Sequence, residues 1–333
     1  MDGRDACIRR AAADARLTLP CGVARPTIRA RTQEGTRMDQ RQVGFIGLGM
    51  MGLPMARSLV ARGFRVLGCD TSDAARAALA EGAPPGAVAF APDPAAVAAA
   101  ADIVVLMLPN SRIVAQVMDG EGGLLAALRP GMLVIDMGSS EPGETRRLAE
   151  AAAARGAALV DAPVSGSVAK ARTGTLAIMV GGDDAAFTKA EPVLRGMGEA
   201  IIRTGAVGSA HAMKALNNFV YAAGLLATAE ALRMGEALGL DLGILTDVMN
   251  ASSGRNIATE TKSRQEIISG RYAGGFQLGL MRKDLDTAGS IAAQTGFDAG
   301  LLALCRDRWA GAVAALGPTV DNTEIHRFIG AKR

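Results

Sequence analysis

The sequence predicts two folded parts, a doubly wound α/β domain and an all-helical domain, joined by one long helix. Short apolar runs alternate with helical stretches from Gln42 to about residue 204, as expected when helices cover both faces of a parallel sheet. Beyond Gly205 the apolar residues recur at helical spacing, and no further strand is predicted. The chain has 333 residues, a length that favours two domains over a single large one.

Seven apolar runs are predicted to be the strands of the sheet. Each is continuous rather than alternating, because a strand that is covered on both faces has no wet side. The runs are Val43–Ile46, Arg65–Cys69, Ile103–Leu108, Met132–Met137, Ala157–Val164, Leu176–Val180 and Ala200–Arg203. We expect them to run parallel to one another.

The long helix is predicted from Ser209 to Leu238. This stretch contains no proline and repeats its apolar residues at helical spacing, and about 30 residues of helix span about 45 Å, enough to join two domains. Four further helices are predicted at Ile244–Met249, Thr261–Ile268, Leu278–Gln294 and Ala299–Leu316. The predicted domains are therefore residues 42–204 and 205–333.

Residues 1–41 are predicted to be a disordered or spurious extension. Residues 1–37 lack hydrophobic periodicity and carry eight Arg against four acidic residues. Two interpretations stay open, a disordered arm or translation from a start codon upstream of Met38. A transit peptide fits poorly because such peptides contain few acidic residues, whereas this stretch contains Asp2, Asp5 and Asp14.

Charge and composition exclude several classes of protein. The formal net charge is +3, and the first 37 residues alone contribute +4, so the folded part has no basic excess for binding nucleic acid. The longest apolar stretch, Ala95–Leu108, is interrupted by Asp102 and is shorter than the roughly 18 residues of a membrane-spanning helix. The four cysteines are scattered along the chain, and no two of them have the spacing of metal ligands: Cys7, Cys21, Cys69 and Cys305. We expect a soluble, cytoplasmic protein with reduced thiols and no metal.

A glycine-rich turn follows the first predicted strand and opens a helix. In such a turn Gly47 allows the tight bend, Gly49 lets the backbone approach a pyrophosphate, and Gly52 permits close packing of helix on strand. The amino end of the helix favours phosphate. The pattern predicts a Rossmann domain that binds a dinucleotide through Gly47, Leu48, Gly49, Met50, Met51 and Gly52. The alternative is a glycine-rich turn without a ligand.

Asp70 ends the second predicted strand, 18 residues beyond Gly52. A carboxylate at this place can accept hydrogen bonds from the adenosine ribose and repels a 2′-phosphate, so NAD is the expected cofactor and NADP remains possible. The alternative is that Asp70 only ends a strand.

Three later segments carry further polar groups. Leu108-Pro109-Asn110 and Asp136–Ser140 follow strands, where loops reach a bound dinucleotide, although strand ends in any α/β protein look similar. Asp161–Ser167 exposes consecutive backbone N–H groups suited to a carboxylate. Lys214 and Asn218 are four residues apart and share one face of the long helix.

Together these segments resemble the β-hydroxyacid dehydrogenase family, the group of 3-hydroxyisobutyrate dehydrogenase and tartronate semialdehyde (2-hydroxy-3-oxopropionate) reductase. The resemblance extends from about Gln42 to Phe328. Four motifs occur in the order of the family: Gly47–Met55, Asp161–Leu176, Gly205–Asn218 and Phe276–Leu285. The four together are far more specific than any one of them.

The resemblance implies a role for each residue of the site. Lys214 would be the catalytic acid/base. The substrate would be bound by Ser165, Gly166, Ser167, Asn218 and Lys283. The cofactor would also contact Leu108, Pro109, Ser139 and Lys283. Ser167 departs from the family, which usually has a second glycine there; its backbone N–H remains, but its side chain can narrow or repolarise the pocket.

The implied function is NAD(P)-dependent interconversion of a small 3-hydroxy acid and its 3-oxo acid. Oxidation of an alcohol needs a base near the hydroxyl, and Lys214 can serve if burial lowers its pKa. The alternatives are reduction of glyoxylate or succinic semialdehyde, which usually uses NADPH, and a non-catalytic binding or scaffold protein. An imine reductase would typically lack the lysine. A homodimer or homotetramer is expected, because long apolar stripes on helices are usually buried against a second copy.

Several other residues are predicted to be structural. His211 precedes Lys214 by three residues and is interpreted as structural or exposed rather than as a proton relay. Asp183 is placed to cap a helix, and Cys305 and Trp309 are predicted to pack in a helical core or a subunit interface.

The segment Ser252–Asn256 allows two interpretations. It can line the outer end of the cleft, with Arg255 or Asn256 reading the far substituent of the substrate, or it can be an ordinary turn between helices.

Overall fold

The computed structural model describes residues 42–330. The predicted extension of residues 1–41 lies outside the described residues, as do residues 331–333.

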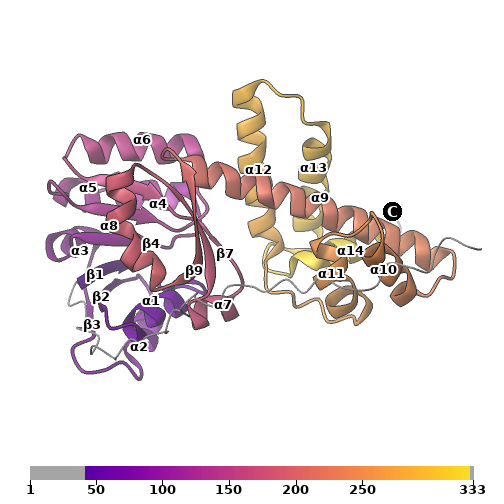
Figure 1. Ribbon diagram of the computed structural model, residues 1–333, viewed down its shortest axis with the longest axis horizontal. Helices are drawn as coiled ribbons and strands as arrows, with labels where there is room; N and C mark the ends of the chain where they lie inside the picture. The colour runs from indigo at the N-terminus through magenta and orange to yellow at the C-terminus, as the bar shows by residue number, and fades with distance from the viewer. Residues whose placement is uncertain (1–41, 331–333) are drawn as a thin grey trace, which may run out of the picture. The chain divides into compact units, whose positions relative to one another are not determined.

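A nine-stranded sheet forms the first part of the described chain (Figure 1). The strands follow the order β3-β2-β1-β4-β5-β6-β8-β7, and β9 pairs with β8. β1 to β6 are parallel neighbours in the Rossmann order, so the sequence crosses over between β1 and β4, where dinucleotides bind in this fold. The strands are β1 (Gln42–Ile46), β2 (Arg65–Cys69), β3 (Val88–Phe90), β4 (Ile103–Leu106), β5 (Leu133–Asp136), β6 (Ala158–Asp161), β7 (Val164–Ser165), β8 (Leu176–Gly181) and β9 (Gly198–Gly205).

The prediction of a wholly parallel sheet is wrong at its far edge. β8 runs antiparallel to both β6 and β7. The predicted strand Ala157–Val164 is divided after Asp161, and Pro163, which lacks an N–H, lies between β6 and β7. The link to β8 contains only the short α7 (Val168–Thr173), whereas a parallel crossover needs about a dozen residues or more. The short edge strand β3 was not predicted at all.

Helices cover both faces of the sheet. One face packs Val43, Phe45 and Val105 against α1 and α8, and the other packs Val104 and Leu106 against α3, α4 and α6. Both faces are therefore dry, which explains why the predicted strands are continuously apolar. The helices are α1 (Gly52–Ala61), α2 (Asp73–Ala80), α3 (Pro94–Ala100), α4 (Ser111–Asp119), α5 (Leu124–Ala127), α6 (Pro142–Ala153) and α8 (Asp184–Arg195).

The long helix α9 (Ser209–Ala237) leads from the sheet into the helical part and confirms the prediction. It packs against α11, α12, α13 and α14. The remaining elements are α10 (Leu242–Ala251), α11 (Ile257–Thr261), the π-helical η1 (Ser263–Ile268), α12 (Leu278–Thr295), α13 (Gly300–Leu316), the 3₁₀ turn η2 (Asn322–Glu324) and α14 (Ile325–Gly330). The predicted helix Thr261–Ile268 is thus a π-helical segment that follows α11. Cys305 and Trp309 are both fully buried in the helical core, as predicted.

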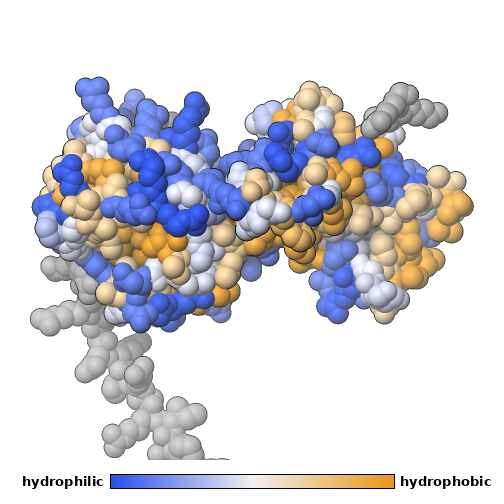
Figure 2. Space-filling view, turned by 90° about the horizontal axis from the view of Figure 1, so that it is seen from above, coloured by the Kyte–Doolittle hydropathy of each residue, from blue (hydrophilic) through white to orange (hydrophobic). Residues whose placement is uncertain are grey.

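A second apolar face of α9 remains exposed. Met213, Leu216, Val220 and Met234 are 48%, 44%, 68% and 63% exposed. Their steps of three, four and fourteen residues return to one side of a helix with 3.6 residues per turn. Figure 2 shows apolar side chains gathered over the helical part of the molecule, at the right of the view.

No helix within residues 42–330 is both long and apolar enough to cross a membrane.

Candidate active site

The glycine turn has the steric design that the sequence predicts. Gly47 has a φ of +96°, a conformation that favours glycine, and a Cβ on Gly52 would lie 1.9 Å from the carbonyl oxygen of Gly47. A Cβ on Gly49 would meet nothing within 4 Å. Gly47 and Gly52 are thus required by the fold itself, whereas the space beside Gly49 is open to a ligand.

Asp70 is tied to the glycine turn. Its carboxylate accepts hydrogen bonds from the backbone N–H of Leu48 at 2.6 Å and of Ser72 at 2.7 Å. Each carboxylate oxygen keeps lone pairs for a further donor. Asp70 therefore fixes the turn after β1 and can still accept a hydrogen bond from a ligand.

The loops after β4 and β5 meet the glycine turn at the carboxyl edge of the sheet. A Cβ on Gly47 would lie 2.3 Å from the carbonyl oxygen of Met107, and one on Gly138 would lie 2.9 Å from that of Leu108. Lys283 of α12 joins both loops, since its Nζ donates to the carbonyl oxygen of Ser139 at 2.7 Å and to that of Pro109 at 3.4 Å. The fold thus brings together the cofactor residues predicted on three separate loops.

Lys214 lies on α9 beside the charged pair of α12. Burial lowers its pKa most, the carboxylate of Asp284 opposes that shift, and the ammonium of Lys283 adds to it. The side chain is partly buried, yet Nζ makes no hydrogen bond or ion pair with any residue in 42–330. An amine in this situation is available to a ligand.

Asp284 is the residue of the site that sequence reasoning missed. It is 2% exposed. Its carboxylate accepts hydrogen bonds from Ser139 Oγ at 2.7 Å and from Asn218 Nδ2 at 2.5 Å, and Lys283 Nζ lies 3.3 Å away. The signal was present, because Asp284 stands on the buried face of α12, where a charged residue is rare unless it is paired. One carboxylate thus connects three of the predicted residues.

Ser165, Gly166 and Ser167 form the turn between β7 and α7. Gly166 has a φ of +141° and is exposed, as is Ser167, while Ser165 is partly buried. Ser167 begins α7 without a side-chain capping hydrogen bond. Among the described residues no hydrogen bond links this turn to Lys214 or Lys283, so the structure does not join it to the rest of the site.

Asp183 caps α8 as predicted. Its side chain accepts a hydrogen bond from the N–H of Ala186 at 2.7 Å. His211 is structural rather than exposed, since its side chain is buried.

The segment Ser252–Asn256 has a structural use. Asn256 caps α11 and donates a hydrogen bond to Thr228 Oγ1 at 3.2 Å, and Arg255 pairs with Glu260 at 2.5 Å. These contacts favour the interpretation of an ordinary turn between helices.

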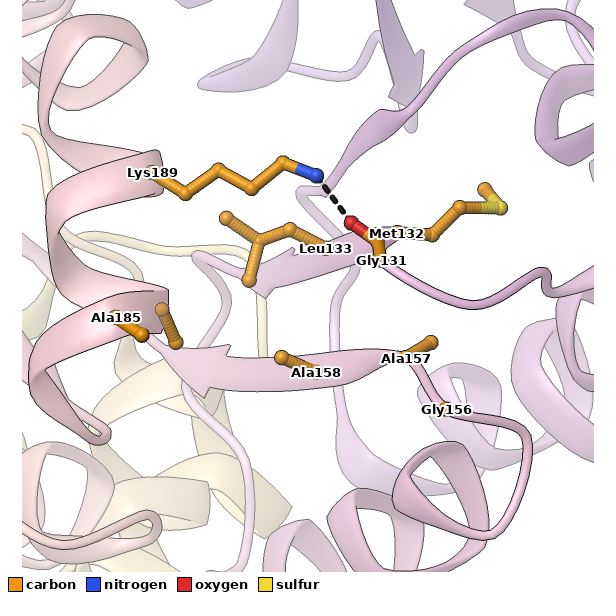
Figure 3. A pocket seen from close by; sticks show the side chains of 9 residues that line it. Gly131, Met132, Leu133, Gly156, Ala157, Ala158, Ala185 and Lys189 are labelled. Atoms are coloured by element: carbon orange, nitrogen blue, oxygen red, sulfur yellow. Dashed lines mark hydrogen bonds between the residues drawn. The ribbon is translucent and has the colours of Figure 1, made fainter.

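A hollow of about 250 Å³ lies at the opposite, amino edge of the sheet, before β5 and β6 (Figure 3). Glycine and alanine line most of it, and Lys189 of α8 reaches across to donate to the carbonyl oxygen of Gly131. It contains none of the predicted site residues. Within residues 42–330 no cluster of His, Cys, Asp or Glu is arranged to bind a metal ion.

Comparisons with known proteins agree with this arrangement. A family model of the NAD binding domain of 6-phosphogluconate dehydrogenase matches residues 42–206, and a model described as NAD-binding of NADP-dependent 3-hydroxyisobutyrate dehydrogenase matches residues 208–329. The 2-(hydroxymethyl)glutarate dehydrogenase of Eubacterium barkeri is 42% identical over 248 residues, which are 74% of this chain and 81% of the relative. The 3-hydroxyisobutyrate dehydrogenase of Pseudomonas aeruginosa is 40% identical over 272 residues, 80% of this chain and 90% of the relative.

A solved structure is also similar to this chain, over most of its length. The 3-hydroxyisobutyrate dehydrogenase of Mycobacterium tuberculosis with L-serine has a TM-score of 0.81 and 34% identity, and the match covers 88% of this chain and 100% of that chain. The fold and the site define an NAD(P)-dependent dehydrogenase. The chain belongs to the β-hydroxyacid dehydrogenase family.

The residues of the glycine turn fit a bound dinucleotide. The open space beside Gly49 lies where the backbone must approach a pyrophosphate, and the amino end of α1 follows it directly. The carboxylate of Asp70 stands at the end of β2 with acceptor capacity left.

Proposed function

We propose that this protein interconverts a short 3-hydroxy acid and its 3-oxo acid, with Lys214 as the general acid and base. The observation that carries the proposal is the partly buried amine of Lys214, which has no partner within residues 42–330 and lies beside the Asp284–Lys283 pair. A structural lysine would normally pair its charge with a carboxylate or reach solvent. An amine kept near charges but unbonded suits a group that must exchange a proton with a substrate.

In the oxidation direction, neutral Lys214 accepts the hydroxyl proton of the substrate as the carbonyl forms. In the reverse direction its ammonium returns that proton to the oxygen. Burial favours the neutral amine, so the pKa of Lys214 lies below that of a solvated lysine and closer to a working pH. The bound nicotinamide supplies the chemistry of hydride exchange.

The substrate carboxylate is assigned to the turn after β7. Its ligands would be the backbone and side chains of Ser165, Gly166 and Ser167, because an exposed turn of small residues offers several N–H donors to one anion. Asn218 and Lys283 would complete the substrate site from α9 and α12. Their hydrogen bonds to Asp284 and to the loop carbonyl of Ser139 hold both side chains at the carboxyl edge of the sheet.

The cofactor is assigned to the glycine turn and the neighbouring loops. Gly47, Leu48, Gly49, Met50, Met51 and Gly52 would contact the pyrophosphate, and Leu108, Pro109, Ser139 and Lys283 the part nearer the nicotinamide. Asp70 would bind the adenosine ribose, and its negative charge favours NAD over NADP.

The test is a screen of the purified full chain for reduction of NAD and of NADP with a panel of alcohols. The panel contains 3-hydroxyisobutyrate, L-serine, 2-(hydroxymethyl)glutarate and D-glycerate, and the reverse panel contains glyoxylate and succinic semialdehyde. We expect turnover of at least one 3-hydroxy acid and a higher kcat/KM with NAD. Activity confined to glyoxylate or succinic semialdehyde with NADPH would contradict both the substrate class and the role of Asp70.

We also propose that the protein is a homodimer or homotetramer. The exposed face of α9 carries Met213, Leu216, Val220 and Met234, and the opposite face of the same helix is already buried in the core. A helix that is apolar on both sides is normally buried on both sides. A second copy of the chain is the occupant that meets this need in a symmetric assembly.

Sedimentation equilibrium of the full chain tests the assembly. We expect a dimer or tetramer for the wild type and a shift to monomer for the double variant Val220→Glu, Met234→Glu. A matched variant, Glu236→Lys, changes an exposed charge near the same end of α9 but on another side of the helix, where it pairs with Arg233, and should assemble normally. A monomeric wild type at micromolar concentration would refute the assembly while leaving the catalytic proposal intact.

A further inference from the structure

Two buried carboxylates face the first turn of α9. Asp136 and Asp161 are the last residues of β5 and β6 and are register partners on these parallel strands. They are 2% and 0% exposed. The side chain of His211 lies between them, 3.8 Å from Asp136 and 4.0 Å from Asp161, and is itself fully buried.

Asp161 anchors the backbone of α9. Its two carboxylate oxygens accept hydrogen bonds from the N–H of Gly208 at 2.8 Å and of His211 at 2.9 Å. Gly208 has a φ of +88° and offers no side-chain cap, so β6 supplies the cap that the helix lacks. The anchor fixes the end of α9 from which Lys214 projects.

The imidazole of His211 adds a second anchor, to α6. Nδ1 lies 2.8 Å from Oγ1 of Thr145, and this hydroxyl also donates to the carbonyl oxygen of Glu141 at 3.0 Å. A threonine hydroxyl has a single proton. When that proton goes to Glu141, the bond between His211 and Thr145 uses a proton on Nδ1, and when it goes to His211, Nδ1 accepts it. Nε2 has no hydrogen-bond partner among residues 42–330.

These contacts argue against a proton relay. His211 makes no hydrogen bond to Lys214 within the described chain, and its ring has no exposed surface through which to exchange protons with solvent. The imidazole of His211 is instead part of a set of buried contacts that link β5, β6 and α6 to α9, the helix that carries the amine of Lys214.

We propose that His211 is a positioning residue for Lys214, acting through the Nδ1 hydrogen bond to Thr145 together with the Asp161 cap. His211 and Lys214 are three residues apart, just under one turn of α9, or a rise of about 4.5 Å. A tilt or rotation of this turn moves the amine relative to Asp284 and Lys283 of α12, the charged residues that face it. The inference rests on the catalytic role proposed for Lys214, and misplacement by about 1 Å can cost up to about a hundredfold in rate.

Four variants of the full chain form the test. His211→Leu removes the hydrogen bond, and Thr145→Val removes it from the other end. His211→Asn keeps a side-chain amide, which can donate or accept a hydrogen bond, near the position of Nδ1. His326→Leu is the control, because His326 is also buried, also bonds a hydroxyl through Nδ1 at 3.0 Å to Tyr272, and also has a Nε2 without a partner. It lies on α14 and contacts α9 near Arg233, about 28 Å of helix from Lys214.

Two readouts separate positioning from general destabilisation. The first is kcat against the KM for NAD. The second is the titration of the Lys214 amine, followed by NMR of the ¹³C-dimethylated lysine and assigned by its loss in Lys214→Arg. We expect His211→Leu and Thr145→Val to lower kcat by about tenfold or more with an unchanged KM for NAD, and to move the titration of Lys214 toward that of a solvated lysine. The double variant should lose no more than either single one, since both act on one bond.

His211→Asn should recover most of the rate, and His326→Leu should leave both readouts unchanged. The proposal is overturned if His211→Leu behaves as the wild type, if His211→Asn is as impaired as His211→Leu, or if His326→Leu causes the same shifts. Should His211→Leu not fold, Thr145→Val decides alone. A wild type without dehydrogenase activity would refute the proposed function, and the NMR titration would still decide whether His211 positions the amine.

Discussion

Two neighbours of opposite charge on α12, Asp284 and Lys283, act on the amine of Lys214. Burial and the ammonium of Lys283 favour its neutral form, and the carboxylate of Asp284 favours its charged form. The balance keeps the pKa below its ordinary value of 10.5. Of these influences on the pKa of Lys214, the charges of Asp284 and Lys283 can each be removed by a single substitution.

Replacing Lys214 tests the proposed acid and base. Lys214→Ala should lower kcat by at least about two orders of magnitude, because positioned acid/base catalysis contributes about a hundredfold or more. Lys214→Arg keeps a charge but not a proton that can leave, and should be equally impaired. Steady-state kinetics of alcohol oxidation give the answer, and binding of NADH measured by fluorescence serves as the control for an intact cofactor site. Near-normal turnover in either variant would move the role to another residue.

The two neighbours of Lys214 should shift the pH profile in opposite directions. Oxidation requires the neutral amine, so its rate rises with pH through the pKa of Lys214. Asp284→Asn removes the charge that raises this pKa and should move the rise to lower pH, whereas Lys283→Met removes a charge that lowers it and should move the rise to higher pH. The measurement is kcat against pH, in which the direction of the shift matters and not the size of kcat. Shifts of the same sign would show that Lys214 is not the titrating group.

At the scale of one element, the turn between β1 and α1 separates what the fold needs from what a ligand needs. Gly52 has no room for a Cβ, because the carbonyl oxygen of Gly47 would lie 1.9 Å from it, and Gly49 has no neighbour within 4 Å. The backbone of Gly49 is not in the left-handed region, so alanine can adopt it without strain.

Alanine substitutions should therefore separate stability from cofactor affinity. Gly52→Ala should destabilise the protein by about 1–3 kcal/mol or more, as overpacking does. Gly49→Ala should change stability by less than about 0.5 kcal/mol and raise the Kd for NAD by about tenfold, equivalent to about 1.4 kcal/mol. Urea unfolding and titration calorimetry measure the two effects. A Gly49→Ala variant with wild-type affinity would show that the pyrophosphate is bound elsewhere.

The packing of α9 also acts at this scale. The amine of Lys214 and core residues such as Leu225 and Leu232 lie on one side of the helix, and the exposed apolar face lies on the other. A single element thereby connects the sheet, the helical core and the proposed contact with a second copy.

For the molecule as a whole, acid should unfold the helical part in a way that depends on His326. Burial, reinforced by the charge of Arg233, lowers the pKa of His326 from 6.5 to about 4. The folded state holds the ring neutral, whereas the unfolded chain binds a proton below about pH 6.5, so stability is lost as the pH falls from about 6.5 toward 4.

Urea unfolding between pH 7 and 4.5 measures this contribution. The wild type should lose stability over that window, and His326→Leu should show a flatter dependence even though its stability at pH 7 is lower. Glu266, whose pKa is lowered mainly by its hydrogen bond to Arg271, also loses its stabilising effect in acid, but only at lower pH. Parallel curves for the two proteins would contradict the assignment to His326.

Local signals were enough to predict much of this architecture. A continuous apolar run followed by glycines at fixed spacing predicted β1, the turn and α1, and a stretch without proline predicted α9 within one residue of its end. The glycines and the lysine of the site could be predicted for the same reason, since their chemistry depends on residue type and on neighbours in the sequence. The direction of β8 could not be predicted, because a continuous apolar run shows that a strand is covered on both faces but not whether it runs parallel or antiparallel to its neighbours.

The roles of two residues around Lys214 could not be predicted from the sequence, because they depend on contacts between distant parts of the chain. Asp284 and His211 are ordinary polar residues in the sequence, and their roles arise from partners 145 and 66 residues away, Ser139 and Thr145. The sequence by itself determined which elements form, because helix, strand and turn preferences act over a few neighbouring residues. Only the tertiary structure decided which buried charges meet, since burial and Coulomb interactions depend on distances in space that residue order does not specify.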